Sequence, residues 1–567
     1  MNKLWKIFKP EDDLAQALSQ ELKISSLTAQ VLINRGIRSV GEADMFLNPR
    51  LNHLCDPMEI PDVDRAARRV LLAKEKGEKI LVFGDYDVDG VTGTVILLHT
   101  LKYLGIDASY YIPHRYGEGY SLSLESVKRI AESGIKLIVT VDCGISNFNE
   151  IEEANALGME VVVTDHHNLA KNLPPAYAIV NPKMISKEHP SRNLSGAGVA
   201  FKFAWALLRI ANVKNNEFLT SLLDLASLGT VSDVVPLTAE NRVLAVAGLN
   251  LINERKRLGI KHLAQAASLY GKISVNHIYF GLAPRINAAG RLEHASKAVE
   301  LLLTNDADQA KALAEELHRI NLRRRGIGSS IKEEVFSKLD ENYLAENKLV
   351  ILSGEDWHPG VIGIVASQIV DRYLRPAVLV GINDGVGRGS ARSVDGLNMF
   401  ELLDSCRDLF LDFGGHEGAA GFEIAPENIL ELKDRLREEI ERVVSAEDLK
   451  PKIAVDAELS PSKISMSLIK ELEVLDPHGE GNPPPVFMSR KLNLFDMRRV
   501  GTDGRHLKLK FTDGKISLDT IGFDLGGLAD KLSYDKSYDI AYKLETNEWN
   551  GFETAQLSLI DIREAKP

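Results

Sequence analysis

The prediction of the fold begins with one stretch of sequence, Ile80-Leu81-Val82-Phe83-Gly84-Asp85-Tyr86-Asp87-Val88-Asp89-Gly90. Its first four residues are apolar and predict a short buried strand, and the amphipathic residues 91–104 after the acidic turn predict a helix. The same order returns with a strand at 137–141, a helix at 150–157 and another strand at 161–163. Strands that alternate with helices predict an α/β fold with a parallel sheet covered by helices on both faces.

The turn after the first strand carries three carboxylates, Asp85, Asp87 and Asp89. Carboxylates this close repel one another, and alternate residues of an extended loop can point to one side, so a divalent cation would neutralise them. The alternative interpretation is structural: Asp89 caps the helix and the other two aspartates form the turn. The turn alone leaves both interpretations open.

Three further segments bring acidic or imidazole side chains to the ends of predicted elements. Asp142 follows the strand 137–141, Asp165-His166-His167 follows the strand 161–163, and Asp233 follows a helical run. Open α/β sheets bind ligands in the crevice beyond the carboxyl ends of their strands. A set rich in oxygen, with imidazole and no sulfur, favours Mn²⁺ first and Mg²⁺ next, and disfavours structural zinc. The candidate metal ligands are Asp85, Asp87, Asp89, Asp142, Asp165, His166, His167 and Asp233.

The rest of the chain predicts further domains, because 567 residues exceed what one hydrophobic core ordinarily serves. The predicted domains are a helical lead-in (1–55), the α/β metal-binding domain (56–238), a helical region (239–346) with a long connecting helix at 306–339, a second α/β domain (347–447) and a small β-barrel (448–567). The barrel is predicted from short alternating runs and Asp-Gly turns. Within the second α/β domain, the glycine-rich segments 385–389 and 414–421 are predicted to be loops.

Composition narrows the class of protein. The net charge of −12 argues against a broad electrostatic coating of nucleic acid but leaves room for a local basic groove. The three cysteines are widely separated, which suits a reducing compartment and gives no thiolate zinc motif. No signal peptide and no apolar run of roughly 20 residues is evident. We therefore predict a cytoplasmic protein.

The acidic segments carry a family resemblance. Asp85 to Gly90, Val-Asp142-Cys-Gly, Asp165-His-His and Gly-Thr-Val-Ser-Asp233 resemble, in order and spacing, the four motifs of the DHH phosphoesterases. Within that superfamily the chain is similar to the RecJ family. The segments that carry this second likeness resemble the DHH-associated domain (387–393 and 414–421) and the start of an oligonucleotide-binding (OB) barrel (477–487). The resemblance runs from about residue 50 to 560.

This resemblance implies a metal-dependent exonuclease that degrades single-stranded DNA 5′ to 3′ to mononucleotides in DNA recombination and repair. It implies two ions, one held by Asp87 and Asp142, the other by Asp89, Asp142, His166 and Asp233. A water shared by the ions would have its pKa lowered from about 15.7 towards neutrality. The implied catalytic residues are Asp142, His166 and His167, and Asp165 would orient a ligand histidine. Phe83 departs from the family, in which many members carry histidine there, and Asp85 is the candidate to supply that ligand.

The resemblance also implies contacts to the DNA strand. Arg115 would bind phosphate, Tyr120 would stack on a base, and residues of the associated domain would grip the backbone and the 5′ phosphate. For Arg285 an ion pair that supports the long helix is the alternative. The candidate nucleic-acid contacts are Arg115, Tyr120, Arg285, Arg388, Ser390, Arg392, Gly415 and His416. The implied partners are single-stranded DNA with a 5′ end, a single-strand-binding protein and a RecQ-type helicase, with the enzyme a monomer away from membranes.

Two other functions fit the same motifs. One is a DHH hydrolase of smaller substrates, an oligoribonuclease or a cyclic-dinucleotide phosphodiesterase, which would leave the C-terminal barrel unexplained. The other is a nucleic-acid-binding scaffold that has lost catalysis. Retaining many mutually repulsive carboxylates without a metal would be costly, which argues against the scaffold.

Overall fold

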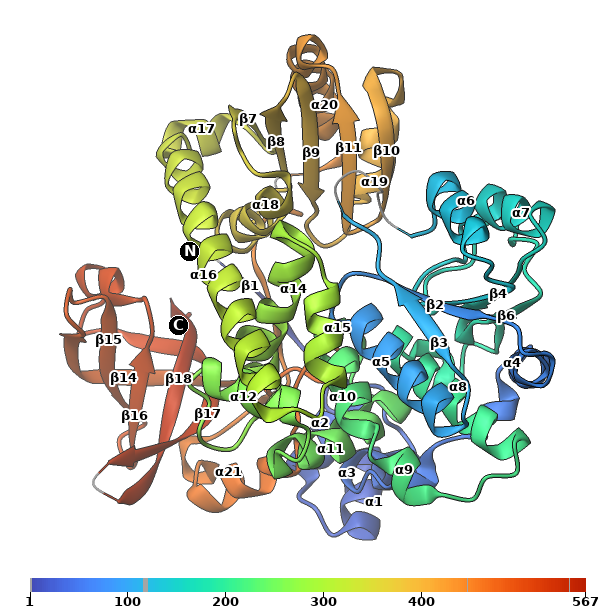
Figure 1. Cartoon of the computed structure of the whole chain (residues 1–567). Coiled ribbons are helices and arrows are strands. Elements are labelled where there is room, and N and C mark those ends of the chain that lie inside the picture. Colours follow the sequence, from blue (N-terminus) through green and yellow to red (C-terminus); the bar gives the residue numbers. More distant parts are fainter. Residues whose placement is uncertain (1–2, 116–120, 446, 550, 567) are drawn as a thin grey trace. The chain divides into compact units, whose positions relative to one another are not determined.

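The computed structural model describes residues 3–115, 121–445, 447–549 and 551–566 (Figure 1). The chain divides into two compact units. The larger unit contains residues 5–318 and 454–567, and the smaller unit contains residues 1–4 and 319–453. Each unit is described by itself.

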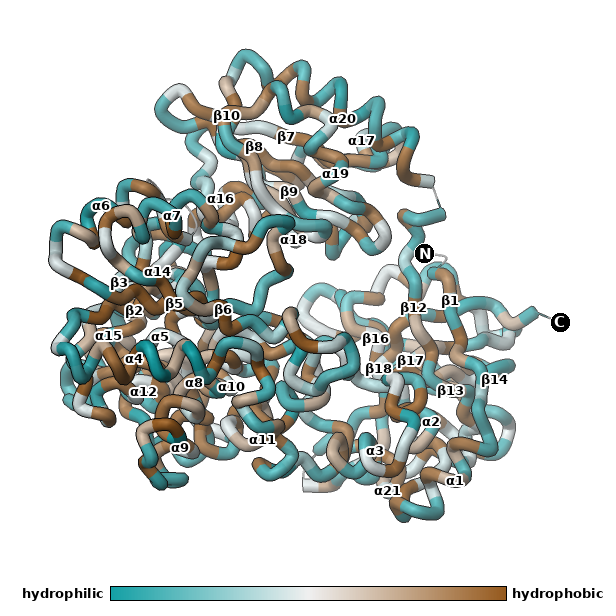
Figure 2. The backbone as a smooth tube through the Cα atoms, turned by 90° about the vertical axis from the view of Figure 1, so that its right-hand side faces the viewer, coloured by the Kyte–Doolittle hydropathy of each residue, from teal (hydrophilic) through white to brown (hydrophobic). Residues whose placement is uncertain are grey.

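A five-stranded parallel sheet forms the centre of the larger unit and confirms the predicted fold class. Its strand order is β3 (Ala108–Tyr111), β2 (Ile80–Gly84), β4 (Leu137–Val141), β5 (Glu160–Thr164) and β6 (Ala178–Val180). Every residue of β2 and β4 is buried, as expected of a parallel sheet covered on both faces. Figure 2 shows the hydrophobic residues concentrated in these strands.

Helices cover both faces of the parallel sheet. Alternate side chains of the strands pack with α6 (Leu124–Glu132) and α7 (Phe148–Ala156) in one hydrophobic cluster. Figure 1 shows α5 (Val88–Tyr103) and α8 (Gly196–Ile210) on the opposite face. Further helices of this unit are α4 (Val63–Lys76), α10 (Leu223–Ser232), α11 (Ala239–Glu254), α12 (Leu258–Ala266), α14 (Ala283–Leu292) and α15 (Ser296–Leu303).

The long connecting helix, predicted at 306–339, forms as α16 (Ala307–Ser337). It begins in the larger unit and ends in the smaller one. No helix within the described ranges has the length and apolar content needed to cross a bilayer.

The smaller unit is built on a mixed sheet. Its order is β10 (Phe410–His416), β11 (Ala419–Ile424), β9 (Val386–Arg392), β8 (Ala377–Asn383) and β7 (Val350–Glu355). Only the β7–β8 pair is parallel among these neighbours. The sheet packs with α18 (Pro359–Tyr373), α19 (Met399–Asp404) and α20 (Ile429–Val443).

The loop prediction for the two glycine-rich segments of this unit was wrong: they lie mainly in β9 and in the β10–β11 hairpin. Close packing explains the glycines. A Cβ at Gly389 would lie 2.1 Å from the ring of Phe422, and one at Gly387 would lie 2.9 Å from Ile424. Glycine inside a strand often marks such a close approach, and here it was mistaken for a loop signal.

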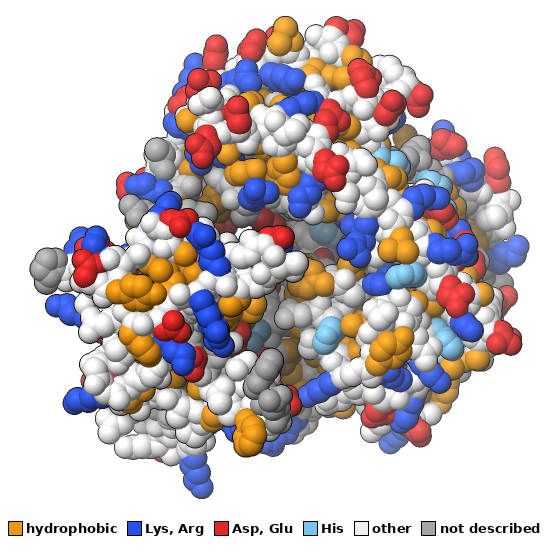
Figure 3. All heavy atoms as spheres, turned by 90° about the vertical axis from the view of Figure 1, so that its left-hand side faces the viewer, with side chains coloured by type: hydrophobic (Ala, Val, Ile, Leu, Met, Phe, Trp, Pro, Cys, Tyr) orange, Lys and Arg blue, Asp and Glu red, His pale blue; other side chains and the backbone are white. Residues whose placement is uncertain are grey.

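The C-terminal barrel also forms as predicted. Its strands are β14 (Phe487–Val500), β15 (His506–Thr512), β16 (Ser517–Gly522), β18 (Phe552–Glu564) and β17 (Ser537–Trp549), and pairing of β14 with β17 closes it. Figure 3 shows Lys and Arg side chains interspersed with Asp and Glu on the face in view.

The N-terminal helices share a hydrophobic core with this barrel. These helices are α1 (Asp12–Leu22), α2 (Ser26–Asn34) and α3 (Val40–Leu47). Leu32 and Phe46 lie in one cluster with Leu509 and Phe511 of β15. A strand that was not predicted, β1 (Leu4–Ile7), pairs with β12 (Lys452–Val455). Its partner lies far along the chain, so local sequence gave no sign of the pairing.

Candidate metal centre

Four segments of the larger unit bring the predicted ligands together. Asp85, Asp142 and the Asp165-His166-His167 run follow β2, β4 and β5 at the carboxyl edge of the sheet, and Asp233 caps the C-terminus of α10. Ligand atoms lie within 4.8 Å of one another in each of three groups. The groups are Asp85, Asp87 and Asp142; Asp89, His166 and Asp233; and Asp142, His166 and His167.

His166 lies at the centre of the second group. Its Nε2 is 3.0 Å from Asp142 Oδ1, 3.6 Å from Asp233 Oδ2 and 3.9 Å from Asp89 Oδ2. Asp142 belongs to two groups, so it is placed to bridge two ions.

The structural interpretation of the acidic turn assigned the helix cap to the wrong aspartate. Asp87, not Asp89, caps α5: its Oδ1 accepts hydrogen bonds from the backbone N–H groups of Asp89 (2.9 Å) and Gly90 (3.1 Å). Asp89 instead accepts from the N–H groups of Gly196 (2.5 Å) and Ala197 (2.9 Å) at the start of α8. Capping of α5 therefore uses one carboxylate oxygen of Asp87 and does not replace metal binding by this residue.

Small residues make room for this cluster, and sequence reasoning missed them. A Cβ at Gly196 would lie 2.6 Å from Asp142 Oδ1, and one at Gly229 would lie 2.6 Å from Asp89 Oδ1. The signal available was the run Ser195-Gly-Ala-Gly198 before a helix, which combines a cap with small residues. Lys183 was also missed; its charge lowers the pKa of Asp233 somewhat, against the larger effect of burial.

Two residues of the cluster have strained backbones. Asp142 has φ of 62°, and Val234, directly after Asp233, also has φ of 62°. This left-handed region is uncommon for residues other than glycine and rare for a β-branched one. Such conformations cost about 1–3 kcal/mol and gather at functional sites.

The metal-free cluster is electrostatically unfavourable. Burial and then the charges of neighbouring aspartates raise the pKa of Asp85, Asp142 and Asp233 well above the usual range. The same two causes raise the pKa of Asp89 to about 7. Burial and the charge of His167 lower the pKa of His166 to about 3, so its imidazole is neutral. Neutral imidazole and carboxylate are the forms that bind metal ions.

Unpartnered atoms test whether a cation fits here. Asp85 Oδ1, His166 Nε2 and Asp233 Oδ2 are buried and make no hydrogen bond of acceptable geometry to any residue that the structure describes. Buried polar atoms normally have partners, and a divalent cation would supply one to all three. The donor set of oxygen with imidazole suits Mn²⁺ or Mg²⁺. Phe83 is fully buried and stacks on Tyr111, with 5.5 Å between ring centroids, so it serves the core.

Family models match three parts of the chain. The DHH family N-terminal domain matches residues 79–230, the DHHA1 domain matches 346–442, and the RecJ OB domain matches 455–561. The single-stranded-DNA-specific exonuclease RecJ of Bacillus subtilis (strain 168) is 38% identical over 98% of this chain and 70% of that protein. The RecJ of Haemophilus influenzae is 36% identical over 94% of both. The chain belongs to the RecJ family of single-stranded-DNA-specific exonucleases.

Solved structures of RecJ agree with this assignment. The crystal structure of RecJ in complex with Mn²⁺ from Thermus thermophilus has a TM-score of 0.86 and 34% identity, covering 100% of this chain and 80% of that one. The corresponding complex with Mg²⁺ has a TM-score of 0.80 and 32% identity, with coverage of 100% and 79%.

Asp165 orients the other histidine of the pair. His167 Nδ1 lies 2.8 Å from Asp165 Oδ1, and the same carboxylate accepts the N–H groups of His166 (2.7 Å) and Ile145 (2.9 Å). Burial alone would raise the pKa of Asp165, but these bonds and the histidine charges hold it below the usual value. The expectation named a ligand histidine without saying which; in this RecJ family member the bonded imidazole is His167.

The predicted DNA contacts of the larger unit lie in different surroundings. The Arg115 guanidinium lies 5.1 Å from the centre of the Tyr86 ring, beside the acidic turn, and its charge lowers the pKa of Asp85 against the larger effect of burial. Arg285 is 8% exposed and donates to Gly281 O (2.5 Å) and His318 Nδ1 (3.1 Å) of α16. Arg285 therefore contacts the long helix by a hydrogen bond. Tyr120 lies outside the described residues.

The predicted contacts of the smaller unit gather on β9 and β10. Arg388 pairs with Glu423 across to β11 (2.8 Å), and Arg392 donates to Ser390 Oγ (3.2 Å). Ser390 and Arg392 lie over α18, because a Cβ added at Gly363 would meet both side chains within 3 Å. His416 is exposed at the end of β10, and Gly415 has φ of 153°.

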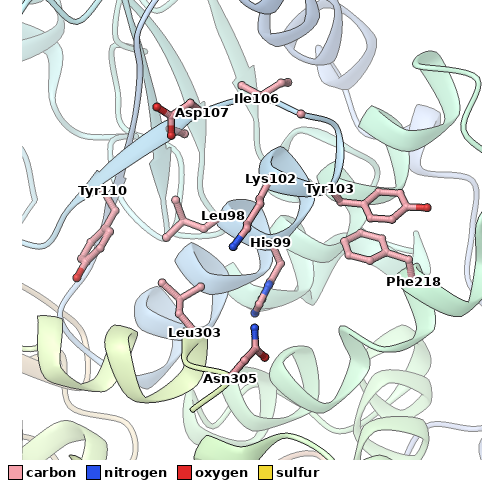
Figure 4. Close-up of a pocket in the computed structure, with 12 residues that line it drawn as sticks. Leu98, His99, Lys102, Tyr103, Ile106, Asp107, Tyr110, Phe218, Leu303 and Asn305 are labelled. Carbon is pink, nitrogen blue, oxygen red and sulfur yellow. The ribbon is translucent and has the colours of Figure 1, made fainter. Parts of the chain in front are cut away.

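A pocket elsewhere on the larger unit is not part of the cluster. It has a volume of about 750 Å³ and lies at the C-terminal end of α5, where Figure 4 shows His99 and Asn305 pointing towards one another. Asp89 lies in the first turn of the same helix, about 15 Å away along the axis from His99 at about 1.5 Å per residue. Burial and the charge of Arg257 lower the pKa of His99 to about 4.

Proposed function

We propose that this chain is a metal-dependent exonuclease that degrades single-stranded DNA from the 5′ end to mononucleotides, acting in DNA recombination and repair. The observation that carries the proposal is the convergence of five aspartates and two histidines from four segments, in a member of the RecJ family. Phosphodiester hydrolysis needs such a site, because both the attacking water and the phosphate require charge stabilisation.

Two sets of residues would hold the cofactor, a pair of Mn²⁺ or Mg²⁺ ions. Asp85, Asp87 and Asp142 form one set, while Asp89, His166 and Asp233 form the other, with Asp142 shared. When bound, such ions supply an activated water and offset negative charge on the phosphate. RecJ structures from Thermus thermophilus in complex with Mn²⁺ and with Mg²⁺ support this choice of ions.

The protein's own residues would position the reacting groups. Asp165 holds His167 by its Nδ1, which leaves the other edge of that imidazole to face a phosphate oxygen or the leaving group. Burial opposes protonation of His167, but the bond to Asp165 raises its pKa, which favours the protonated ring that a proton donor requires. Asp142, His166 and His167 are the proposed catalytic residues.

Positive groups would bind the DNA backbone. In the larger unit, Arg115 lies beside the acidic turn and would contact a phosphate near the cluster. In the smaller unit, Ser390 and Arg392 lie beside α18 near its N-terminus, where the helix dipole favours an anion such as the 5′ phosphate. The other proposed contacts are Tyr120, Arg285, Arg388, Gly415 and His416.

The barrel would extend the path of the strand. Phe495 on β14 is half exposed and could stack on a base, which contributes about 1–3 kcal/mol per base. Phe487 is fully buried and belongs to the core. We further propose a monomer in a reducing, cytoplasmic setting, working with a single-strand-binding protein and a RecQ-type helicase.

One time course tests the proposal. The full chain with Mn²⁺ is given long single-stranded DNA labelled at the 5′ or the 3′ end, the matching duplex, a short RNA and a cyclic dinucleotide. We expect early release of the 5′ label as mononucleotide from the long single strand alone, and none with the Asp142→Asn variant. Faster cleavage of the short RNA or the cyclic dinucleotide would overturn the proposal.

A further inference from the structure

A second cluster of metal-binding side chains lies away from the proposed catalytic cluster. Cys55 follows the short 3-10 helix Leu51–His53, Glu59 ends the next one, Pro57–Glu59, and His189 precedes a third, Pro190–Asn193. A ligand atom of each of the three side chains lies within 4.8 Å of the other two. The family resemblance and the catalytic proposal use none of these residues.

Hydrogen bonds already orient the cluster. His189 Nε2 lies 2.8 Å from Glu59 Oε2, and His189 Nδ1 accepts the N–H of Ser191 at 3.1 Å. The backbone of Cys55 is fixed on both sides, because its N–H donates to Glu240 Oε1 (2.5 Å) and its C=O accepts from Lys202 Nζ (2.6 Å). The thiol is therefore held where the imidazole and the carboxylate converge.

One buried carboxylate oxygen beside the cluster lacks a partner. Glu240 Oε2 belongs to a fully buried side chain and makes no hydrogen bond of ordinary geometry within the described residues. Glu240 and Ser191 are both next to the cysteine: burial and then the charge of Glu240 raise the pKa of the Cys55 thiol, while a hydrogen bond with the Ser191 side chain lowers it. An unpartnered buried carboxylate oxygen beside a thiol and an imidazole points to a missing cation.

We propose that Cys55, Glu59 and His189 bind one Zn²⁺ ion, or a similar thiophilic divalent ion, separately from the catalytic pair. Thiolate with imidazole selects zinc over Mg²⁺ or Mn²⁺, whereas the catalytic cluster contains no sulfur ligand. Zinc bond lengths of about 2.0–2.3 Å place ligand atoms a little over 3 Å apart, so the histidine and the glutamate need only separate slightly. Three protein ligands leave a fourth tetrahedral position to water.

Binding has a defined proton balance. The Cys55 thiol loses its proton as the S–Zn bond forms, and Glu59 binds as the carboxylate. For Nε2 to bind the ion, the imidazole proton moves from Nε2 to Nδ1, so Nδ1 no longer accepts the hydrogen bond from Ser191 N–H. One proton is released for each ion bound, so the affinity rises with pH.

The position of the cluster suggests what the ion does. His189 and Ser191 lie just before Gly196 and Ala197, whose N–H groups hold Asp89 of the catalytic cluster. An ion that joins Cys55 and Glu59 to His189 would fix the start of this segment. The ion would therefore hold this segment in place. The site was not evident in the sequence because one cysteine, with a histidine more than 130 residues later, matches no zinc spacing.

Alkylation of the wild-type full chain tests the site. Cys143 and Cys406 are each 1% exposed, whereas Cys55 is partly exposed and reacts first in the folded protein. We expect Zn²⁺ to slow alkylation of Cys55 on the order of tenfold or more, because a coordinated thiolate is shielded. Mg²⁺ is the matched control, since it occupies carboxylate sites without binding sulfur. An unchanged rate with Zn²⁺ would overturn the proposal.

Variants and a spectrum give a second test. Co²⁺ added to the metal-free chain should produce thiolate-to-cobalt absorption in the near ultraviolet in the wild type and in Cys406→Ser, and none in Cys55→Ser. His189→Ala and Glu59→Gln should each abolish zinc protection while Cys55 stays reactive. Absorption that persists in Cys55→Ser, or protection that survives both other changes, would refute the site.

Discussion

Asp142 has the most constrained position of the proposed metal ligands. It follows a buried strand, adopts a left-handed backbone conformation and lies within ligand distance of both proposed ion sites. Gly196 leaves the space that its carboxylate occupies. A residue with this combination is expected to contribute more to catalysis than any neighbour that acts through another side chain.

Two isosteric substitutions compare a proposed metal ligand with a residue that acts through another side chain. Asp165→Asn changes a carboxylate that orients His167 and should lower kcat about 10–100-fold, the usual cost of losing such a supporting group. Asp142→Asn removes a ligand shared by both ions and should lower kcat further, by more than about 100-fold. Steady-state hydrolysis of 5′-labelled single-stranded DNA in Mn²⁺ measures both.

Stability provides the control for this pair. Without metal, Asp142→Asn replaces a buried carboxyl group whose ionisation is disfavoured by burial and by neighbouring aspartates, so the metal-free variant should melt at the same temperature as the wild type or higher. An Asp142→Asn protein that is folded and as active as Asp165→Asn would contradict the bridging role.

The pH dependence of metal stabilisation follows from Asp89. Burial and the charge of Asp87 raise its pKa to about 7 in the metal-free fold, above its value in an unfolded chain. The folded chain therefore holds a proton that the unfolded chain has lost, so this group's contribution to stability falls as pH rises from about 4 through 7. Mn²⁺ binds the ionised carboxylate, and its stabilisation should grow over that range.

Thermal unfolding measures this effect. The difference in Tm between the Mn²⁺-loaded and the chelator-treated protein should increase between about pH 5.5 and about pH 8, while histidine effects common to both samples cancel. The same difference for Asp142→Asn should be small and nearly flat. A wild-type difference that shrinks with rising pH would contradict the account.

At this scale the sequence predicted which side chains meet but not how each is held. The predicted strand ends place Asp85, Asp142 and His166 at one edge of the sheet, where the structure has them. The different roles of Asp87, which caps α5, and Asp89 could not be predicted. Asp89 accepts hydrogen bonds from the start of a helix more than 100 residues later in the sequence.

Among the elements, apolar periodicity predicted the strands and helices that have one buried side. Glycine residues wrongly indicated loops where packing is unusually close. The boundaries of β4 and α16 agree with expectation to within two residues. The segment that forms β9 looked like a loop because glycines alternate in it, and only the Phe422 ring against its backbone explains them.

Substitution of Gly389 tests that explanation. Gly389→Ala would place a Cβ 2.1 Å from the Phe422 ring, and such overpacking should lower the local free energy of unfolding by about 1–3 kcal/mol. Gly421→Ala, on the neighbouring strand β11, is the matched control, because its nearest described atom would be 3.6 Å away. Native-state hydrogen exchange of the β9 amides measures both; equal protection in the two variants would refute the packing argument.

In the larger unit, one buried arginine forms hydrogen bonds with segments that lie far apart in the sequence. Arg242 of α11 is 1% exposed and donates to the carbonyl groups of Phe46 (2.6 Å), Asp476 (2.6 Å) and Pro477 (3.1 Å). Its guanidinium also lies 3.8 Å from the centre of the Phe46 ring. The helical region, the N-terminal helices and the approach to the barrel therefore depend on one side chain, which sequence patterns gave no reason to single out.

Arg242→Lys tests this connection. Lysine lacks the planar fork of donors, so at least one buried carbonyl group loses its partner, at a cost of about 1–3 kcal/mol. Limited proteolysis should cleave the variant sooner than the wild type, both near residue 47 and within 474–484. Arg209→Lys is the control, because Arg209 pairs with Asp56 at an exposed site, and it should match the wild type. Equal digestion of the two variants would contradict the role of Arg242.

The most direct measurement is anomalous scattering from crystals of the full chain grown with Mn²⁺. We expect two peaks about 3.5–4 Å apart, both in contact with Asp142. One should also contact Asp85 and Asp87, and the other Asp89, His166 and Asp233. A single peak, or peaks that Asp142 does not touch, would contradict this expectation.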